Sequence, residues 1–373
     1  MEKVSKILVT GAKGFIGRNL VVELKNRGYE NILEYDLDTD KSLLGKYTRE
    51  CNFVFHLAGV NRPKDEKEFM EGNFKFTSEL LNLLKEKNNP VPVLVSSSFQ
   101  ADNANAYGPS KKAGEDILFE YSRETGSDVY VYRLNNLFGK WSRPNYNSVV
   151  STFCHNISHG IDIQINDPAY KLTLSYIDDV VSEFISAKEG NANKPGEYCV
   201  VSKAYTITLG NLAEKIYSFK KSRKSLGIPN MADEFTAKLY STYLSYLPEG
   251  EFSYPLKMNI DNRGSFTEFI RTPERGQVSV NISKPGITKG NHWHHKKNEK
   301  FLVVKGFGVI RFRKIGSKKV IKYEVSGEKL EAVDIPPGYT HNIENTGNVD
   351  MVTIMWASEC FNPEKSDTYY VEV

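Results

Sequence analysis

Three histidines and one glutamate toward the end of the sequence have the spacing of a metal site. His292 and His294 are two residues apart, so on a strand their side chains leave the same face. The turn-like residues HKKN lead to Glu299, which can return to the histidines across a hairpin, and His341 follows another strand-like run. Imidazole and carboxylate together suit zinc, Zn2+, or another divalent transition metal. His295 points to the opposite face and is predicted not to be a ligand.

A glycine-rich stretch, TGAKGFIG, is the second feature with chemical meaning. It lies between a short buried strand at Lys6–Val9 and a helical pattern over Asn19–Lys25, which is the context of a dinucleotide-binding loop. The glycines permit a tight turn and a close approach of the pyrophosphate, and the helix N-terminus offers free N–H groups. The predicted cofactor contacts in this stretch are Gly11, Gly14, Phe15, Ile16 and Gly17.

Asp36 directly follows the second predicted strand, Asn31–Tyr35. A carboxylate about twenty residues past the glycines can accept hydrogen bonds from the adenosine ribose, which favours NAD(H) over NADP(H). An aspartate that only caps a loop would have the same position in the sequence, so both interpretations stay open here.

Tyr107 and Lys111 are the third chemical feature. They lie four residues apart in YGPSK, so a helix places them on one face, and Pro109 is tolerated in the first turn of that helix. An ammonium beside a phenol lowers the phenol pKa and holds the hydroxyl where it can give or take a proton. A buried run at Val91–Val95, followed by three serines, precedes the pair.

These features resemble the extended short-chain dehydrogenase/reductase family, which has the glycine spacing G-x2-G-x2-G. The resemblance implies a catalytic set of Ser98, Tyr107 and Lys111, with Ser97 as the second choice for the serine. The interval from Ser98 to Tyr107 is shorter than in many members of the family, which implies a trimmed loop on the substrate side.

The same resemblance implies further contacts along the chain. The segment after the third predicted strand, Phe53–His56, lies beside the cofactor in that family, and Lys111 holds the cofactor ribose. The stretch RLNNLFGK matches a segment that lies beside the substrate in that family. The implied contacts are Leu57, Ala58 and Gly59 for the cofactor, and Arg133 and Asn136 for the substrate.

The histidine-rich stretch resembles the two motifs of the cupin family, H-x-H-x4-E-x6-G and P-x-G-x2-H-x3-N. Leu330 stands where the second motif usually begins with glycine, which affects a turn and no ligand. DNRGSFTEF resembles the deoxysugar 3,5-epimerase branch of cupins, which uses a histidine base and no metal. The matching residue is His292, so the resemblance implies the epimerase role without its base. Arg263 and Lys289 are candidate diphosphate contacts, or solvated surface cations.

The 373 residues predict two domains with a boundary near residue 247. Residues 1–246 are expected to form an α/β Rossmann-like, doubly wound parallel sheet, with strands at Phe53–His56 and Val129–Leu134. The amphipathic helices Leu209–Lys221 and Met231–Leu244 are expected to cover the substrate cleft or to pack in a dimer. Residues 247–373 are expected to form an all-β cupin domain, a jelly-roll barrel.

Composition excludes several classes of protein. The 49 Lys+Arg residues nearly balance the 46 Asp+Glu residues, which argues against nucleic-acid binding. No apolar run is long enough to predict membrane insertion, and the first apolar run leads directly into the glycine loop instead of a signal peptide. Four scattered cysteines are typical of reduced thiols, so we expect a cytoplasmic protein.

The whole chain resembles bifunctional capsular polysaccharide enzymes, most clearly in HLAGVNRP, LFGKW, PNYNSV, LYSTYLSYLP and residues 252–356. The resemblance implies a UDP-sugar substrate, a UDP-2-acetamido-2,6-dideoxy-4-hexulose. The cupin would epimerise C3 and the Rossmann domain would reduce C4, giving a UDP-N-acetyl-L-talosamine-type product. It also implies zinc, a homodimer and NADP(H), and this longer match outweighs the preference of Asp36 for NAD(H).

Two other functions stay open from the sequence. One is a nucleotide-sugar dehydratase or 4-epimerase with tightly bound, recycled NAD and a sensory cupin. The other is a sugar-binding regulatory protein, against which Tyr107 and Lys111 argue. The sequence also leaves open whether the metal is catalytic or structural.

Overall fold

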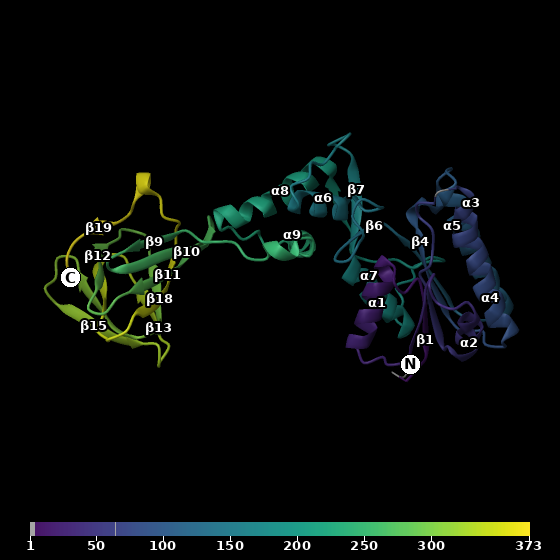
Figure 1. Cartoon of the computed structure of the whole chain (residues 1–373), viewed down its shortest axis with the longest axis horizontal. Coiled ribbons are helices and arrows are strands. Elements are labelled where there is room, and N and C mark those ends of the chain that lie inside the picture. Colours follow the sequence, from purple (N-terminus) through teal and green to yellow (C-terminus); the bar gives the residue numbers. More distant parts are fainter. Residues whose placement is uncertain (1–3, 64) are drawn as a thin grey trace. The chain divides into compact units, whose positions relative to one another are not determined.

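The computed structural model describes residues 4–63 and 65–373, and the chain divides into two compact units (Figure 1). The first unit comprises Met1–Tyr217 and Ala232–Pro248, and the second comprises Ser218–Met231 and Glu249–Val373. Sequence reasoning placed Ser218–Met231 in the first domain. The backbone explains the difference, since the Arg271 N–H donates to the Leu226 carbonyl at 2.8 Å and ties this segment to the β strands.

A five-stranded parallel sheet forms the centre of the first unit, in the order β2-β1-β3-β4-β5. On β1, Ile7 and Val9 belong to one buried cluster and Leu8 to the other, and all three are fully buried. This pattern is expected where helices cover both faces of a parallel sheet. The strands are β1 (Ile7–Thr10), β2 (Ile32–Tyr35), β3 (Phe53–His56), β4 (Val93–Ser98) and β5 (Val129–Leu134).

Helices pack on both faces of this sheet, as Figure 1 shows. The face that carries Ile7 packs against α1 (Phe15–Asn26) and α7 (Ile177–Lys188). The opposite face packs against α2 (Ser42–Glu50), α4 (Phe76–Glu86) and α5 (Tyr107–Thr125). The predicted Rossmann-like architecture is therefore confirmed.

Smaller elements complete the first unit. Strands β6, β7 and β8 form a three-stranded sheet. Helix α4 is preceded by a short helix and a π-helical turn, so the helical path begins at Lys67. The bounds are α3 (Lys67–Phe69), π-helix η1 (Met70–Lys75), 3-10 helix η2 (Phe99–Asp102), β6 (Asn136–Phe138), α6 (Val149–Ser158), β7 (Lys171–Tyr176), β8 (Tyr205–Thr208), α8 (Leu209–Ser225) and α9 (Glu234–Leu244).

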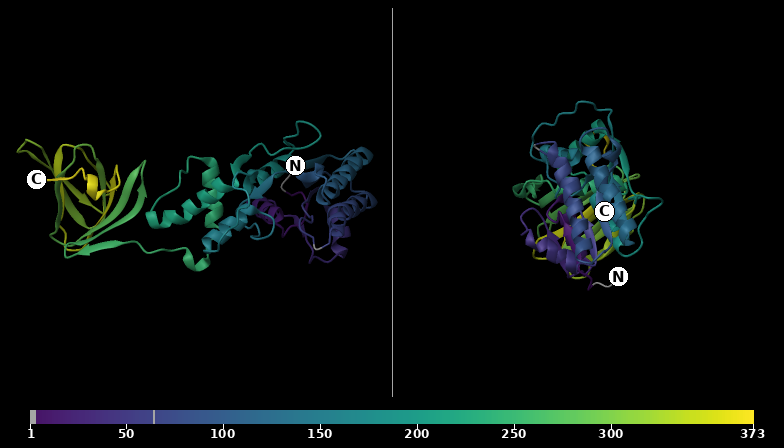
Figure 2. Two further views of the ribbon diagram at one scale, coloured as in Figure 1. Left: turned by 90° about the horizontal axis from the view of Figure 1, so that it is seen from above. Right: turned by 90° about the vertical axis from the view of Figure 1, so that its right-hand side faces the viewer.

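Two antiparallel sheets form the second unit, in the orders β16-β13-β18-β11-β10-β9 and β15-β14-β17-β12-β19. Both contribute to one apolar core, in which Phe301 and Val303 of the first sheet meet Ile310 and Phe312 of the second. Figure 2 shows these strands, green to yellow, from two further sides. The antiparallel β architecture expected for the C-terminal part of the chain is thus confirmed. The bounds are η3 (Glu249–Glu251), β9 (Met258–Asp261), β10 (Gly264–Thr272), β11 (Gly276–Ser283), β12 (Thr288–Trp293), β13 (Glu299–Lys305), β14 (Phe307–Lys314), β15 (Val320–Ser326), β16 (Ala332–Ile335), β17 (Tyr339–Asn345), β18 (Met351–Ala357), η4 (Pro363–Lys365) and β19 (Tyr369–Tyr370).

The four cysteines are free thiols, as their scattered positions in the sequence predict. Cys51, Cys154 and Cys199 are buried free thiols and Cys360 is a half-buried one. Within residues 4–63 and 65–373, no helix combines the length and the apolar character needed to cross a bilayer.

Candidate functional site

The glycine loop joins β1 to α1 and packs against the segment after β3. Gly11 has φ +67°, and a Cβ there would lie 2.7 Å from the backbone nitrogen of Ala58. A Cβ at Gly17 would lie 2.1 Å from the Gly11 carbonyl oxygen. Gly14 is the N-cap of α1, and no side chain caps the first N–H groups of the helix. The loop therefore presents backbone donors and a helix N-terminus, which fit a pyrophosphate.

The other predicted cofactor residues surround this loop. Phe15 and Ile16 are the first residues of α1, so their N–H groups belong to its open end. The carbonyl carbon of Leu57 would lie 2.9 Å from a Cβ at Gly11. A Cβ at Gly59 would lie 2.9 Å from the Asn73 side chain. These close approaches explain why small residues occur on both sides of the expected dinucleotide site.

Asp36 lies directly after β2 and bonds to the glycine loop. Its Oδ2 accepts the Lys13 N–H at 2.7 Å, and its Oδ1 accepts the Leu37 N–H at 2.8 Å. The Lys13 ammonium forms an exposed ion pair with Asp38. Asp36 is thus a loop cap, one of the two interpretations that the sequence allows. The Lys13 ammonium lies near Asp36, at the strand end where this fold places the adenosine ribose.

Tyr107 and Lys111 lie on the first turn of α5, as the spacing predicts. Lys111 Nζ lies 5.8 Å from the centre of the Tyr107 ring and 3.5 Å from the Ser96 carbonyl oxygen. The Tyr107 hydroxyl donates to Asn61 Oδ1 at 3.1 Å. Burial lowers the pKa of Lys111 to about 8 and raises the pKa of Tyr107. The expected lowering of the Tyr107 pKa does not occur, because the ammonium approaches a carbonyl and not the phenol oxygen.

The two candidate serines differ in their partners. Ser98 is the last residue of β4, and its hydroxyl accepts the Gln100 N–H at 3.1 Å. A hydrogen bond with Ser98 also opposes the rise in the pKa of Tyr107. Ser97 is buried and donates to Glu115 Oε1 at 2.5 Å. The structure therefore brings Ser98 to Tyr107 and uses Ser97 inside the fold.

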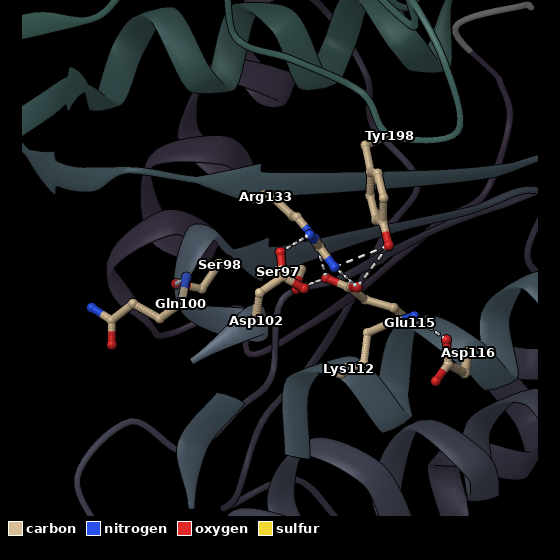
Figure 3. Close-up of polar contacts among 9 residues, drawn as sticks. All are labelled: Ser97, Ser98, Gln100, Asp102, Lys112, Glu115, Asp116, Arg133 and Tyr198. Carbon is tan, nitrogen blue, oxygen red and sulfur yellow. Dashed lines mark hydrogen bonds and ion pairs between the residues drawn. The ribbon is translucent and has the colours of Figure 1, made fainter. Parts of the chain in front are cut away.

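Arg133, expected beside the substrate, takes part in an internal ion pair (Figure 3). Its Nε and Nη2 donate to the two carboxylate oxygens of Glu115 at 3.0 and 2.7 Å, and its Nη1 donates to Asp102 at 2.6 Å. The Tyr198 hydroxyl accepts from Nη2 at 3.0 Å, and its ring lies 4.0 Å from the guanidinium. Arg133 thus ties β5 to α5, and its guanidinium is bound by Glu115, Asp102 and Tyr198.

We expect Arg133→Met to destabilise the first unit strongly. Glu115 is 1% exposed, so the substitution leaves a buried carboxylate without its cation. Such a loss costs about 3 kcal/mol of unfolding free energy. Lys112→Met on the same helix is the matched control, because its ion pair with Asp116 is exposed and contributes less than about 1 kcal/mol. Equal denaturant midpoints for the two variants would contradict this prediction.

The remaining predicted substrate residues belong to both units of the chain. Asn136 is exposed at the start of β6, in the first unit. Arg263 is exposed and paired with Asp261 at 2.6 Å, in the second unit. Lys289 is half-buried, and its Nζ donates to Asn281 Oδ1 and to a backbone carbonyl, both at 2.8 Å. Burial lowers the Lys289 pKa, and the nearby Arg263 charge contributes to that shift.

The four predicted metal ligands converge in the second unit. One ligand atom each from His292, His294, Glu299 and His341 lies within 4.8 Å of the others. Glu299 Oε2 lies 3.5 Å from His294 Nε2 and 3.3 Å from His341 Nε2. His292 and His341 face each other on β12 and β17 of one sheet, whereas Glu299 opens β13 of the other. The cluster therefore joins the two sheets.

A β-bulge directs His292 into the cluster. The register of β12 against β17 shifts between Gly290 and His292, and Asn291 between them has φ 58°. This shift places His292 opposite His341. His295 lies outside the cluster, with its ring centre 4.4 Å from that of Trp293, in agreement with its predicted non-ligand role.

The donor atoms of the cluster fit a divalent metal ion. In the described part of the chain, His294 Nε2, Glu299 Oε2 and both ring nitrogens of His341 are buried and make no hydrogen bond. Such atoms are costly without a partner, which a cation supplies. Burial opposes ionisation of Glu299, but the neighbouring histidines hold its pKa well below the usual range. Burial lowers the His292 pKa to about 4, so its imidazole is neutral and able to bind metal.

Three residues that shape these sites were not found from the sequence. Asn61, whose Oδ1 accepts a hydrogen bond from the Tyr107 hydroxyl, lies within the stretch HLAGVNRP, which was matched as a whole without assigning a role to this residue. Glu115 follows Lys111 by four residues, and that helical spacing could have revealed it. Asp367 accepts three backbone N–H groups from the turn before Glu299, across 70 residues of sequence that carry no motif linking them.

The first unit has the features of a class of enzymes that bind a nicotinamide dinucleotide on a glycine loop, beside a helix with the Tyr-x3-Lys spacing. Residues 7–201 match the NAD dependent epimerase/dehydratase family, and residues 259–369 match the polysaccharide biosynthesis C-terminal domain. The chain belongs to the NAD dependent epimerase/dehydratase family.

Relatives with known functions refine this assignment. The UDP-2-acetamido-2,6-beta-L-arabino-hexul-4-ose reductase of Pseudomonas aeruginosa is 45% identical over 368 residues, which cover 99% of each chain. The crystal structure of the capsular polysaccharide assembling protein CapF from Staphylococcus aureus matches with a TM-score of 0.94 and 53% identity, over 99% of this chain and 100% of that one. The predicted resemblance to CapF-type capsular polysaccharide enzymes is confirmed.

More distant proteins share the fold of the first unit. UDP-glucose 4-epimerase from Thermotoga maritima matches with a TM-score of 0.54 and 21% identity, over 65% of this chain and 98% of that one. UDP-glucuronate 4-epimerase 2 from Arabidopsis thaliana is 26% identical over 335 residues, covering 71% of this chain and 75% of the relative.

Proposed function

We propose that the protein is a bifunctional nucleotide-sugar enzyme. The second unit epimerises C3 of a UDP-2-acetamido-2,6-dideoxy-4-hexulose, and the first unit reduces the C4 ketone with NADPH. The product is a UDP-2-acetamido-2,6-dideoxy-L-talose. The observation that carries the proposal is the match to a UDP-hexul-4-ose reductase at 45% identity over 99% of both chains.

The first unit is suited to the reduction. A bound nicotinamide supplies the hydride to C4. Tyr107 protonates the C4 oxygen as it becomes an alkoxide, because its hydroxyl lies at the start of α5 beside Ser98. Lys111, with a pKa of about 8, is mostly protonated at neutral pH and stabilises negative charge developing beside it. Ser98 adds a hydroxyl next to Tyr107 that can donate to the ketone.

The second unit is suited to the epimerisation. The C4 ketone makes the C3 proton acidic, and its removal places negative charge on the C4 oxygen. A divalent ion held by His292, His294, Glu299 and His341 would supply Lewis-acid stabilisation for that charge. Arg263 is the exposed cation that can pair with the diphosphate, with the half-buried Lys289 behind it. The metal-holding fold proposed here is a cupin, and zinc suits its three imidazoles and one carboxylate.

We propose NADPH as the cofactor because of the charges beside the glycine loop. The Asp36 carboxylate already accepts two backbone N–H groups, and the Lys13 ammonium beside it is exposed. Lys13 can leave Asp38 for a 2′-phosphate, which carries more negative charge.

Lys13→Met should therefore lower kcat/KM for NADPH about tenfold and change the value for NADH by less than about threefold. Lys25→Met is the matched control, since Lys25 forms a comparable exposed ion pair with Glu34 on the same helix-and-strand pair. Equal losses with both cofactors would remove Lys13 from phosphate binding. A wild-type preference for NADH would show that Asp36 sets the specificity.

One assay separates the proposed function from its alternatives. Incubation with a 4-keto UDP-sugar and NADPH should consume the cofactor stoichiometrically, as followed by absorbance. A dehydratase or 4-epimerase that recycles tightly bound NAD would show no net consumption, and a regulatory protein would show no turnover. The homodimer stays a prediction that rests on the resemblance, and the cytoplasmic location stays a prediction that rests on the scattered cysteines.

A further inference from the structure

A short segment far from the metal ligands in sequence folds onto the hairpin that carries them. This closing segment, residues 367–373, contains β19, which pairs with β12. Tyr370 lies opposite His292, and Tyr369 lies opposite Trp293. The segment therefore adds an outer strand beside β12, which carries His292 and ends directly before His294.

Asp367 holds the turn between two ligands. Its carboxylate accepts the N–H groups of His295, Lys296 and Lys297 at 3.0, 2.8 and 2.9 Å. These three residues, with Asn298, connect His294 to Glu299, so their conformation sets the separation of the two ligands. An ionised carboxylate that accepts several backbone donors gives strong, charge-assisted hydrogen bonds.

The backbone of Asp367 acts on a ligand directly. Its carbonyl oxygen forms a short hydrogen bond with Nδ1 of His294. A carbonyl accepts only, so Nδ1 carries the proton and Nε2 is left as the free lone pair. His294 Nε2 is the atom that lies 3.5 Å from Glu299 in the cluster. The contact therefore selects the tautomer of His294 that can bind a metal there.

Hydrogen bonds to β12, β14 and β17 hold the rest of the closing segment in place. The Val371 N–H donates to the Asn291 carbonyl at 2.9 Å, at the bulge before His292. The Thr340 hydroxyl donates to the Val371 carbonyl, and Thr340 is fully buried next to His341. The Arg313 side chain donates to the carbonyl of Glu372. The segment thus joins β12, β14 and β17 behind the cluster.

We propose that the closing segment, chiefly through Asp367, is a positioning device for the metal centre and sets its affinity. The inference rests on the proposed metal site and adds to it residues that bind no metal themselves. Partners in the outer shell of a metal site orient the ligands before binding, and their loss typically weakens metal affinity by about 10- to 100-fold. Without the closing segment, His294 samples both tautomers, and the backbone N–H groups of residues 295–297 lose the carboxylate that accepts them.

Zinc affinity of the full chain, measured by competition with a chromophoric chelator, tests the proposal. We expect Asp367→Ala to weaken Zn2+ binding about tenfold, and a chain shortened to end at Ser366 to weaken it about 100-fold. Asp367→Asn keeps one side-chain acceptor, so its affinity should fall between those of wild type and Asp367→Ala. Asn362→Ala is the matched control, because Asn362 caps the neighbouring η4 and does not touch the hairpin.

A second measurement separates positioning from general stability. The rise in melting temperature on adding zinc should shrink in Asp367→Ala and in the shortened chain, and stay at the wild-type value in Asn362→Ala. Wild-type zinc affinity in folded Asp367→Ala and Asp367→Asn would overturn the positioning role and leave the metal site standing. A wild-type chain that binds no divalent metal would overturn the metal site and this inference together.

Discussion

Tyr107→Phe should abolish NADPH oxidation while C3 proton exchange with solvent continues at the wild-type rate. The phenol serves only the step that protonates the C4 oxygen, and loss of such a general acid typically costs about 10²- to 10⁴-fold in rate. The C3 proton is handled in the other unit, where the His/Glu cluster lies. Cofactor absorbance measures the first activity, and deuterium incorporation from D2O, read by NMR, measures the second.

Tyr121→Phe is the matched control for this prediction. Tyr121 lies on the same helix and is buried, and its hydroxyl donates to the Val91 carbonyl at 3.0 Å, away from the site. It should lose some stability and keep both activities. Normal reduction by Tyr107→Phe would contradict the catalytic role of that hydroxyl.

Glu299→Ala and His292→Ala should lose the bound metal, lose C3 proton exchange and lower the melting temperature of the second unit. Glu299 belongs to one sheet, and His292 and His341 belong to the other. His294 directly follows β12 of that other sheet, so a bound ion would cross-link the two sheets. A ligand that binds only the folded state at 1,000 times its dissociation constant adds about 4 kcal/mol. For a domain of this size, we expect a drop of more than about 10 °C.

His295→Ala is the control that the sequence itself offers. His295 is an exposed histidine in the same stretch and lies outside the cluster, so the variant should keep metal, exchange and melting temperature. A metal-depleted chain that stays folded and exchanges the C3 proton normally would rule out a catalytic role for the ion. Metal retained at full affinity by His292→Ala would remove that residue from the ligand set.

The elements predicted best are those whose burial leaves a pattern in the sequence. Phe53–His56 and Val129–Leu134 have the predicted bounds, because buried parallel strands are apolar on both faces and end abruptly at polar turns. The four candidate ligands also meet as expected, since the side-chain period of a strand and the hairpin between them fix their directions. The strand bounds and the meeting of the four ligands both follow from local backbone geometry, which the sequence pattern reflects.

What sequence reasoning missed depends on contacts between distant residues. The ion pair between Arg133 and the buried Glu115 carboxylate on α5 joins residues 18 apart in the sequence, and no local pattern specifies that pairing. β4 continues through Ser98, beyond the apolar run, because the three serines pair with Tyr132–Leu134 of β5. Asp367 acts across 70 residues of sequence, so no local period reveals it.

The division of the chain into units has an evolutionary consequence. The chain changes unit at residues 217/218, 231/232 and 248/249, and α8 begins in the first unit and ends in the second. A single crossover within the gene therefore cannot exchange one complete unit for a homologous one. A cut at 217 deprives the first unit of Ala232–Pro248, and a cut at 248 deprives the second of Ser218–Met231. The two units are therefore expected to be inherited together, and phylogenetic trees built from each should have the same branching order.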